Sequence, residues 1–160
     1  MKRSICRFTP LLLTIGLLLP GSSPAQEYVV GNLLLRLPEG FRRISLDKET
    51  VPSPVPGAEP TTEHSARFRS ENGSTLFLLS WRGVFPRDRG PMEAVWSRHV
   101  TVAGLPCELV RTSLFMGKKQ KVHALFCPLD DRGGFLLYSP DLPPDRFRAL
   151  LGGITLRKER

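Results

Sequence analysis

Two cysteines, Cys107 and Cys127, constrain the fold of this chain more than any other feature of its sequence. They flank a turn-like stretch, "MGKKQ", and Gly117 within it is the arithmetic midpoint between them. If the flanking segments form a hairpin centred on that glycine, the cysteines lie directly opposite each other on one face. Directly opposed residues have Cβ atoms about 4.5–5.5 Å apart, near the distance that a disulfide spans. The spacing therefore predicts a disulfide that cross-links a β-hairpin.

Chemistry at these cysteines is the alternative to a structural bond. A zinc site needs three or four ligands, but His123 and Cys127 in one strand would lie about 13 Å apart. A thioredoxin-like redox site requires Cys-x-x-Cys, which is absent from the sequence. A cysteine nucleophile with His123 or His99 as its base would require a free thiol. We predict the disulfide, with no metal, no cofactor and no catalytic residue, and keep the metal site and the nucleophile as weaker alternatives.

The N-terminal residues 1–25 have the pattern of a secretory signal peptide. Lys2, Arg3 and Arg7 form a basic start, and a mainly apolar run of nine residues, Leu11–Leu19, follows. That run is much shorter than the roughly 20 residues that cross a bilayer. The pattern predicts cleavage before Gln26, export to the periplasm or medium, and no stable transmembrane anchor; an uncleaved anchor is the alternative. An oxidising compartment also suits a disulfide.

The remaining residues, 26–160, are enough for a single exported domain. Removing residues 1–25 takes away three of 23 basic residues and none of 15 acidic ones, which leaves a net charge of +5. This charge favours anionic surfaces such as lipid headgroups, polysaccharide or an acidic protein. The arginines are scattered rather than gathered in one motif, which argues against nucleic acid as a partner.

Apolar periodicity and turn residues predict short strands joined mainly by hairpins. Asn72 and Gly73 give the strongest hairpin turn signal. The predicted strands are Tyr28–Val30, Leu33–Leu37, Ala66–Arg69, Thr75–Trp81, Cys107–Phe115, Gln120–Cys127, Gly134–Ser139 and Ile154–Arg157.

Two helices are predicted beside these strands. Met92, Val95, Trp96 and His99 follow the spacing of one helix face, after Pro91 at a first helical position. A last helix starts at the prolines of "LPPDRFRALLGG" and ends at the glycines. The expected class is α+β, with a mainly antiparallel sheet and two helices packed on it.

A proline-rich segment, residues 47–64, is expected to be an exposed extended loop. It contains four prolines and no aromatic or charge cluster, and no role is evident for His64 at its end.

One arginine cluster is a candidate anion-binding site. Arg82, Arg87 and Arg89 precede the first predicted helix, and helix N-terminal amides together with arginines favour anions. A solvated arginine loop, partly neutralised by Asp88, is the alternative. A wider basic surface would require these arginines to form one patch with the lysines of residues 118–121.

Three phrases, "LRLPEGF", "VAGLPCELVRTS" and "DRFRALLGGITLR", resemble the PsbP-like superfamily in their order. That family includes the photosystem extrinsic subunit and small exported bacterial proteins. The resemblance implies an α/β/α sandwich around an antiparallel sheet and implies no catalytic residues. The cysteine pair is not part of the family pattern.

Hydrolase, zinc-protease, phosphate-loop and dinucleotide motifs are all absent from the sequence. The adjacent Asp130 and Asp131 indicate a turn rather than a catalytic dyad. We therefore expect an exported non-enzymatic binding or assembly-accessory domain with an unknown protein or envelope partner. The alternatives are a basic binder of anionic lipid or glycan at the envelope surface and an enzyme with an unrecognised site.

Overall fold

The computed structural model describes residues 25–53, 55–83, 94–115, 118–130 and 133–157. Within these residues the chain forms ten strands and one helix. In chain order they are β1 (Gln26–Val30), β2 (Leu33–Leu37), β3 (Phe41–Val51), β4 (Thr61–Ser70), β5 (Thr75–Arg82), β6 (Ala94–Val102), β7 (Leu105–Phe115), β8 (Lys118–Asp130), β9 (Gly133–Ser139), α1 (Pro144–Leu151) and β10 (Ile154–Leu156).

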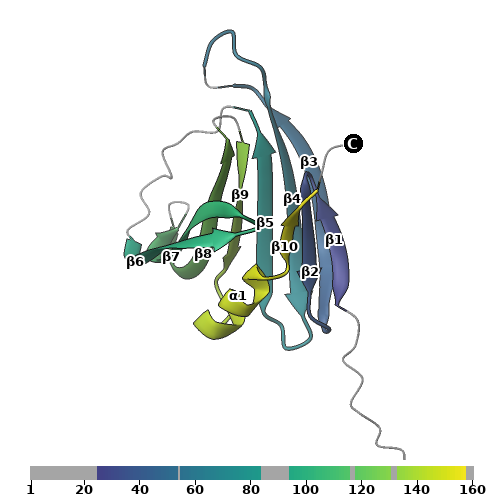
Figure 1. Ribbon diagram of the computed structural model, residues 1–160, viewed down its shortest axis with the longest axis vertical. Coiled ribbons are helices and arrows are strands. Elements are labelled where there is room, and N and C mark those ends of the chain that lie inside the picture. Colours follow the sequence, from purple (N-terminus) through teal and green to yellow (C-terminus); the bar gives the residue numbers. More distant parts are fainter. Residues whose placement is uncertain (1–24, 54, 84–93, 116–117, 131–132, 158–160) are drawn as a thin grey trace, which may run out of the picture.

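The strands form two antiparallel sheets (Figure 1). A large sheet has the order β3-β4-β5-β9-β8-β7-β6, and a small sheet has the order β1-β2-β10. Of the described residues, 69% are in strands and 7% in the helix. The prediction of an α+β fold with two helices is therefore wrong, as is the α/β/α sandwich that the PsbP-like resemblance implied.

Strand β6 stands where the first helix was predicted, and it pairs with β7 along its length. Pro91 and Met92, at the predicted start of that helix, lie outside the described residues. Helical spacing of a few apolar residues also fits a strand, and β-branched residues at Val100, Thr101 and Val102 favour the strand. The two-residue turn after β6 decides the outcome. Ala103 and Gly104 have φ values of 53° and 79°, and Val102 pairs with Leu105 across them. Positive φ at both turn residues suits a tight hairpin, so the sequence "AG" marks the turn between two strands. The helical spacing of the apolar residues led to a helix being predicted instead.

The β1–β2 and β4–β5 hairpins agree with the predicted strands, whereas β3 and its pairing with β4 were not predicted. Gly31 and Asn32 join β1 to β2, and β4 returns as β5 around the Asn72–Gly73 turn, where Gly73 has a φ of 87°. The last helix and its closing strand are also present. The proline-rich segment is shorter than the sequence indicates, because β3 extends to Val51 and β4 begins at Thr61.

The core lies between the large sheet on one side and the small sheet with α1 on the other, and Figure 1 shows α1 and β10 lying across the large sheet. Alternate residues of β4 and β5 face this core, among them Phe68 and Leu76. Phe147 of α1 is 1% exposed and anchors the helix there. We call the core-facing side of the large sheet its inner face.

Candidate functional site

A polar cleft lies on the inner face, where the strands run beyond the small sheet. Its volume is about 930 Å³. Polar and charged side chains predominate among the residues that line it, which differs from the apolar core further along the same strands. The lining residues are Gly31, Asn32, Thr62, His64, Ser80, Trp81, Arg82, Leu129, Asp130, Gly133 and Arg157.

The sheet floor of this cleft is made by two neighbouring cross-strand rows. The first pairs His64 with Ser80, and Ser80 with Phe135. The second pairs Thr62 with Arg82, and Arg82 with Gly133. Residues two apart on a strand share a face, so His64 and Thr62 continue the side of β4 that carries Ala66 and Phe68 in the core.

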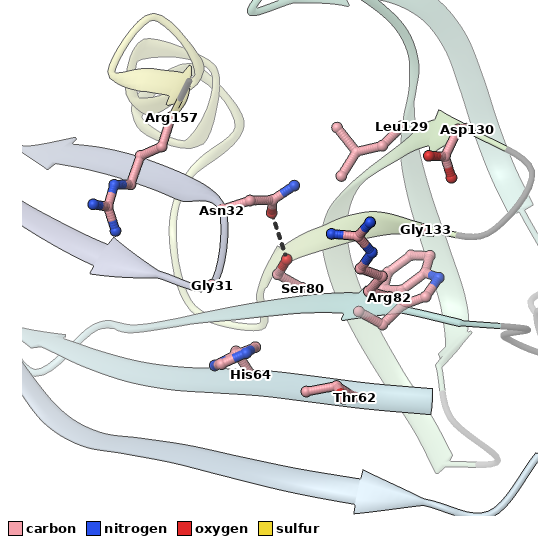
Figure 2. Close-up of a pocket in the computed structure, with 11 residues that line it drawn as sticks. Gly31, Asn32, Thr62, His64, Ser80, Arg82, Leu129, Asp130, Gly133 and Arg157 are labelled. Atoms are coloured by element: carbon pink, nitrogen blue, oxygen red, sulfur yellow. Dashed lines mark hydrogen bonds between the residues drawn. The ribbon is translucent and has the colours of Figure 1, made fainter. Parts of the chain in front are cut away.

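The small sheet supplies the opposite wall. The Ser80 hydroxyl donates a hydrogen bond to Oδ1 of Asn32, with 3.0 Å between the oxygens. The backbone N–H of Arg157 donates to the carbonyl of Asn32, with 2.8 Å between N and O. Figure 2 shows Asn32 and Arg157 on one side of the cleft and His64 and Thr62 on β4 below them. These two hydrogen bonds fix the turn after β1 and the end of β10 against β5.

Close packing at the turn holds this wall near the floor. Gly31 has a φ of 58°, and a Cβ built there would lie 3.2 Å from Oγ of Ser80 and 3.3 Å from Cδ2 of His64. A side chain at this position would be strained by its φ and crowded by its neighbours. Glycine therefore allows the turn to approach the floor of the cleft.

The charges around the cleft are mainly positive. Arg82 and Arg157 are exposed at its edge, Asp130 is the one acid among the lining residues named above, and Lys48 pairs with His64 from the neighbouring strand. Burial, and then the positive charge of Lys48, lower the pKa of His64. His64 is therefore neutral at pH 7 and can both donate and accept a hydrogen bond.

The arrangement does not prepare Ser80 as a nucleophile. Its single hydroxyl proton is directed to Asn32, an amide that cannot serve as a general base. An activated serine needs that proton held by a basic nitrogen. The cleft can hydrogen-bond and pair with a ligand, and these contacts suit recognition.

The predicted disulfide is confirmed: Cys107 and Cys127 are bonded, with Cα atoms 4.3 Å apart. The neighbouring pair Glu108 and Phe126 shows the expected register. Nearer the turn the register shifts between Thr112 and Leu114, so Phe115 pairs with Lys118. The pairing near the cysteines is therefore centred on position 117, as predicted, whereas the pairing next to the turn is centred between positions 116 and 117.

The predicted arginine site is described by the structure only at Arg82. Arg82 lines the cleft, while Arg87 and Arg89 lie outside the described residues. Lys118 begins β8 at the end opposite Asp130, whose partner Gly133 also pairs with Arg82. Twelve strand residues span about 40 Å, so Arg82 and Lys118 do not share one patch.

The histidines have separate positions. His99 is exposed on β6 opposite Glu108, and His123 lies on β8 opposite Arg111. Among the residues that the structure describes, no group of three or more histidine, cysteine, aspartate or glutamate side chains could hold a metal ion.

Sequence reasoning missed His64, Ser80, Asn32 and Arg157 as site residues. A signal for two of them was present. On β5 the core-facing positions change from Leu76 and Leu78 to Ser80, and on β4 they change from Phe68 and Ala66 to His64. The strand pattern alone places each set on one face. A polar residue that continues an apolar face marks the point where the core ends and a cleft can begin.

Comparisons with protein-family models, with curated proteins and with solved structures found no match to this chain. None of the helices in the described parts of the chain is long and apolar enough to cross a membrane.

We expect the protein to lose stability as the pH falls below about 6.5, the ordinary histidine value. Burial is the main cause that lowers the pKa of His64 and of His123 in the folded state. The unfolded chain then binds protons that the folded chain does not, so the free energy of unfolding decreases with falling pH. Urea denaturation at about pH 7.5 and about pH 5.5 measures this change.

The control is a variant with glutamine at both histidines. It keeps Glu63, whose pKa is raised by burial and by Glu49 and which acts in the opposite direction at acid pH. The variant should show a smaller loss between the two pH values than the wild type. An equal loss in both proteins would contradict the assignment.

Proposed function

We propose that this protein is an exported, non-enzymatic binding domain whose ligand is an acidic saccharide, a polyol that carries a carboxylate or phosphate. One observation carries the proposal: Arg82 of the large sheet and Arg157 after the small sheet line the same polar cleft. The two arginines come from distant parts of the sequence, and the pairing of β10 with β2 brings them together.

The residue types in the cleft suit such a ligand. A guanidinium presents N–H groups in a planar fork that matches a carboxylate or phosphate. Thr62, His64 and Asn32 add groups that donate or accept hydrogen bonds, as sugar hydroxyls require. The volume of about 930 Å³ is at the upper end of ligand pockets, which are about 300–1,000 Å³.

Export is supported by two features of different kinds. Residues 1–25 have a signal-peptide pattern. The disulfide suits an oxidising compartment such as a periplasm or the exterior of the cell.

Calorimetric titration of the oxidised protein with glucuronate, glucose 6-phosphate and glucose tests the proposal. The two acidic sugars should bind and glucose should bind much more weakly, because only the acidic sugars can pair with the arginines. Arg157→Ala should weaken glucuronate binding about tenfold or more, the size expected for a lost charge-assisted hydrogen bond. Arg82→Ala should act in the same direction.

Arg69→Ala is the matched control, because Arg69 is an exposed arginine near the other end of β4 and does not line the cleft. It removes the same charge and should leave glucuronate binding unchanged. Affinity should also fall with added salt. Equal binding of glucose and glucuronate, or equal losses in Arg69→Ala and Arg157→Ala, would refute the proposal.

A further inference from the structure

A second cavity, of about 260 Å³, lies on the inner face between the β6–β7 edge of the large sheet and α1. Its walls are mainly apolar: Val95 and Trp96 come from β6, Leu109 from β7, and Pro144 and Phe147 from α1. Leu109 and Phe147 belong to the buried core, so they form a fixed floor. The cavity is separate from the polar cleft and shares no lining residue with it.

Two of the apolar side chains that line this cavity are exposed. Val95 is 67% exposed and Trp96 is 42% exposed. The register of β6 against β7 shifts between Ala94 and Trp96, so Val95 is an extra residue in the strand. Bulges of this kind redirect side chains and are frequent beside binding sites. Here the bulge allows two consecutive residues, Val95 and Trp96, to line the same cavity.

Positive charge converges on this apolar cavity. Arg111 pairs with Trp96 across the two strands and lines the cavity together with Arg148 and His123. Burial is the main cause that lowers the pKa of His123, and the positive charges of Arg111 and Arg148 lower it further. Arg148 has a weak ion pair with Asp145, with 3.7 Å between nitrogen and oxygen. No described acidic side chain forms an ion pair with Arg111.

We propose that this cavity binds a small amphiphilic anion, an alkyl or aryl carboxylate, with its apolar body against Trp96 and Phe147 and its carboxylate at Arg111. The size of the cavity limits the ligand. An apolar cavity of about 150 Å³ holds one benzene molecule, so 260 Å³ accommodates about ten non-hydrogen atoms. Octanoate has this size and combines the two required properties. The site is independent of the saccharide cleft and differs from it in ligand class.

Trp96 provides a direct measurement of binding, because the sequence contains one other tryptophan, Trp81. In a Trp81→Phe background, octanoate should change the emission of Trp96 saturably, and calorimetry on the wild-type oxidised protein should give the same affinity. Octanol should bind more weakly than octanoate. Trp96→Ala, an exposed position on an edge strand, should weaken both ligands in calorimetry without unfolding the protein.

Arg111→Gln separates the charge from the apolar contact. It should weaken octanoate about tenfold or more while leaving octanol unchanged, since only the carboxylate pairs with the guanidinium. Arg146→Gln is the control: it removes one exposed charge from the same helix as Arg148 but does not line the cavity. It should leave octanoate binding unchanged.

Three outcomes would overturn the inference. One is that octanoate produces neither a saturable change in emission nor heat. Another is equal affinity for octanoate in Arg111→Gln and the wild type. The third is an equal loss in Arg146→Gln and Arg111→Gln, which would reduce the effect to the overall charge of the protein.

Discussion

Breaking the bond between Cys107 and Cys127 is expected to lower the free energy of unfolding by about 3 kcal/mol. The cysteines are 20 residues apart in sequence, and the bond restricts a loop of that length in the unfolded chain. Total stabilities of single domains are about 5–15 kcal/mol, so this loss is a large fraction. Guanidinium denaturation of the oxidised protein, the reduced protein and the Cys107→Ala/Cys127→Ala double variant measures it.

Reduction and substitution should lower the free energy of unfolding by similar amounts, because both remove the cross-link. Alanine is only one sulfur atom smaller than cysteine, so the double substitution leaves only a small cavity. Alkylation of the purified protein without reductant, followed by mass spectrometry, establishes the starting state. Two alkylated thiols in that protein, or an unchanged denaturation midpoint after reduction, would contradict the prediction.

The second large effect is expected from Gly153→Ala. A Cβ at this position would lie 2.2 Å from the backbone carbonyl oxygen of Arg36, so strand β2 and the end of α1 would have to separate. The same two residues are joined by a hydrogen bond from the N–H of Arg36 to the carbonyl of Gly153, with 2.8 Å between N and O. Overpacking of this kind costs about 1–3 kcal/mol, and the clash with backbone favours the upper end.

The adjacent glycine provides a matched control. Gly152 has φ and ψ values of −67° and −15°, which suit any residue, and a Cβ there would meet nothing within 4 Å. Gly152→Ala should leave stability unchanged or raise it by about 0.4–1 kcal/mol, because alanine restricts the unfolded chain. Thermal or urea denaturation compares the two variants. Similar midpoints for Gly152→Ala and Gly153→Ala would show that the close contact with β2 does not matter.

Local turn chemistry explains which parts of the fold could be predicted from sequence. The Asn72–Gly73 turn and the cysteine spacing each placed a hairpin correctly, because a hairpin depends on residues that are near in sequence. The helix predicted around Trp96 is wrong, and the reason is again a local turn. Its apolar spacing fitted two periods, and the tight turn at Ala103 and Gly104, across which β6 pairs with β7, selected the strand.

The candidate cleft was less predictable, because its residues come from distant segments. Arg82 was identified from a local arginine cluster, and it does line the cleft. Arg157, at the end of the described chain, joins it only because β10 pairs with β2. No local pattern expresses that pairing, since a strand of three residues carries little periodicity. The sequence does show polar residues, His64 and Ser80, after the apolar positions of two strands. It does not show which face of those strands is buried, so it could not identify these residues as part of a cleft.

The small sheet has a consequence for the order in which the protein can be assembled during synthesis. Its strand β10 is the last element that the structure describes, and it pairs with β2, the second, with Ile154 opposite Leu35. The hairpin of β1 and β2 leaves the ribosome or export channel long before β10, the third strand of the small sheet. Until then β2 is an edge strand whose backbone groups on one side are unpaired, and such an edge can pair incorrectly with another chain. Arg157 follows β10 directly, so a nascent chain acquires the described cleft only when β10 has emerged.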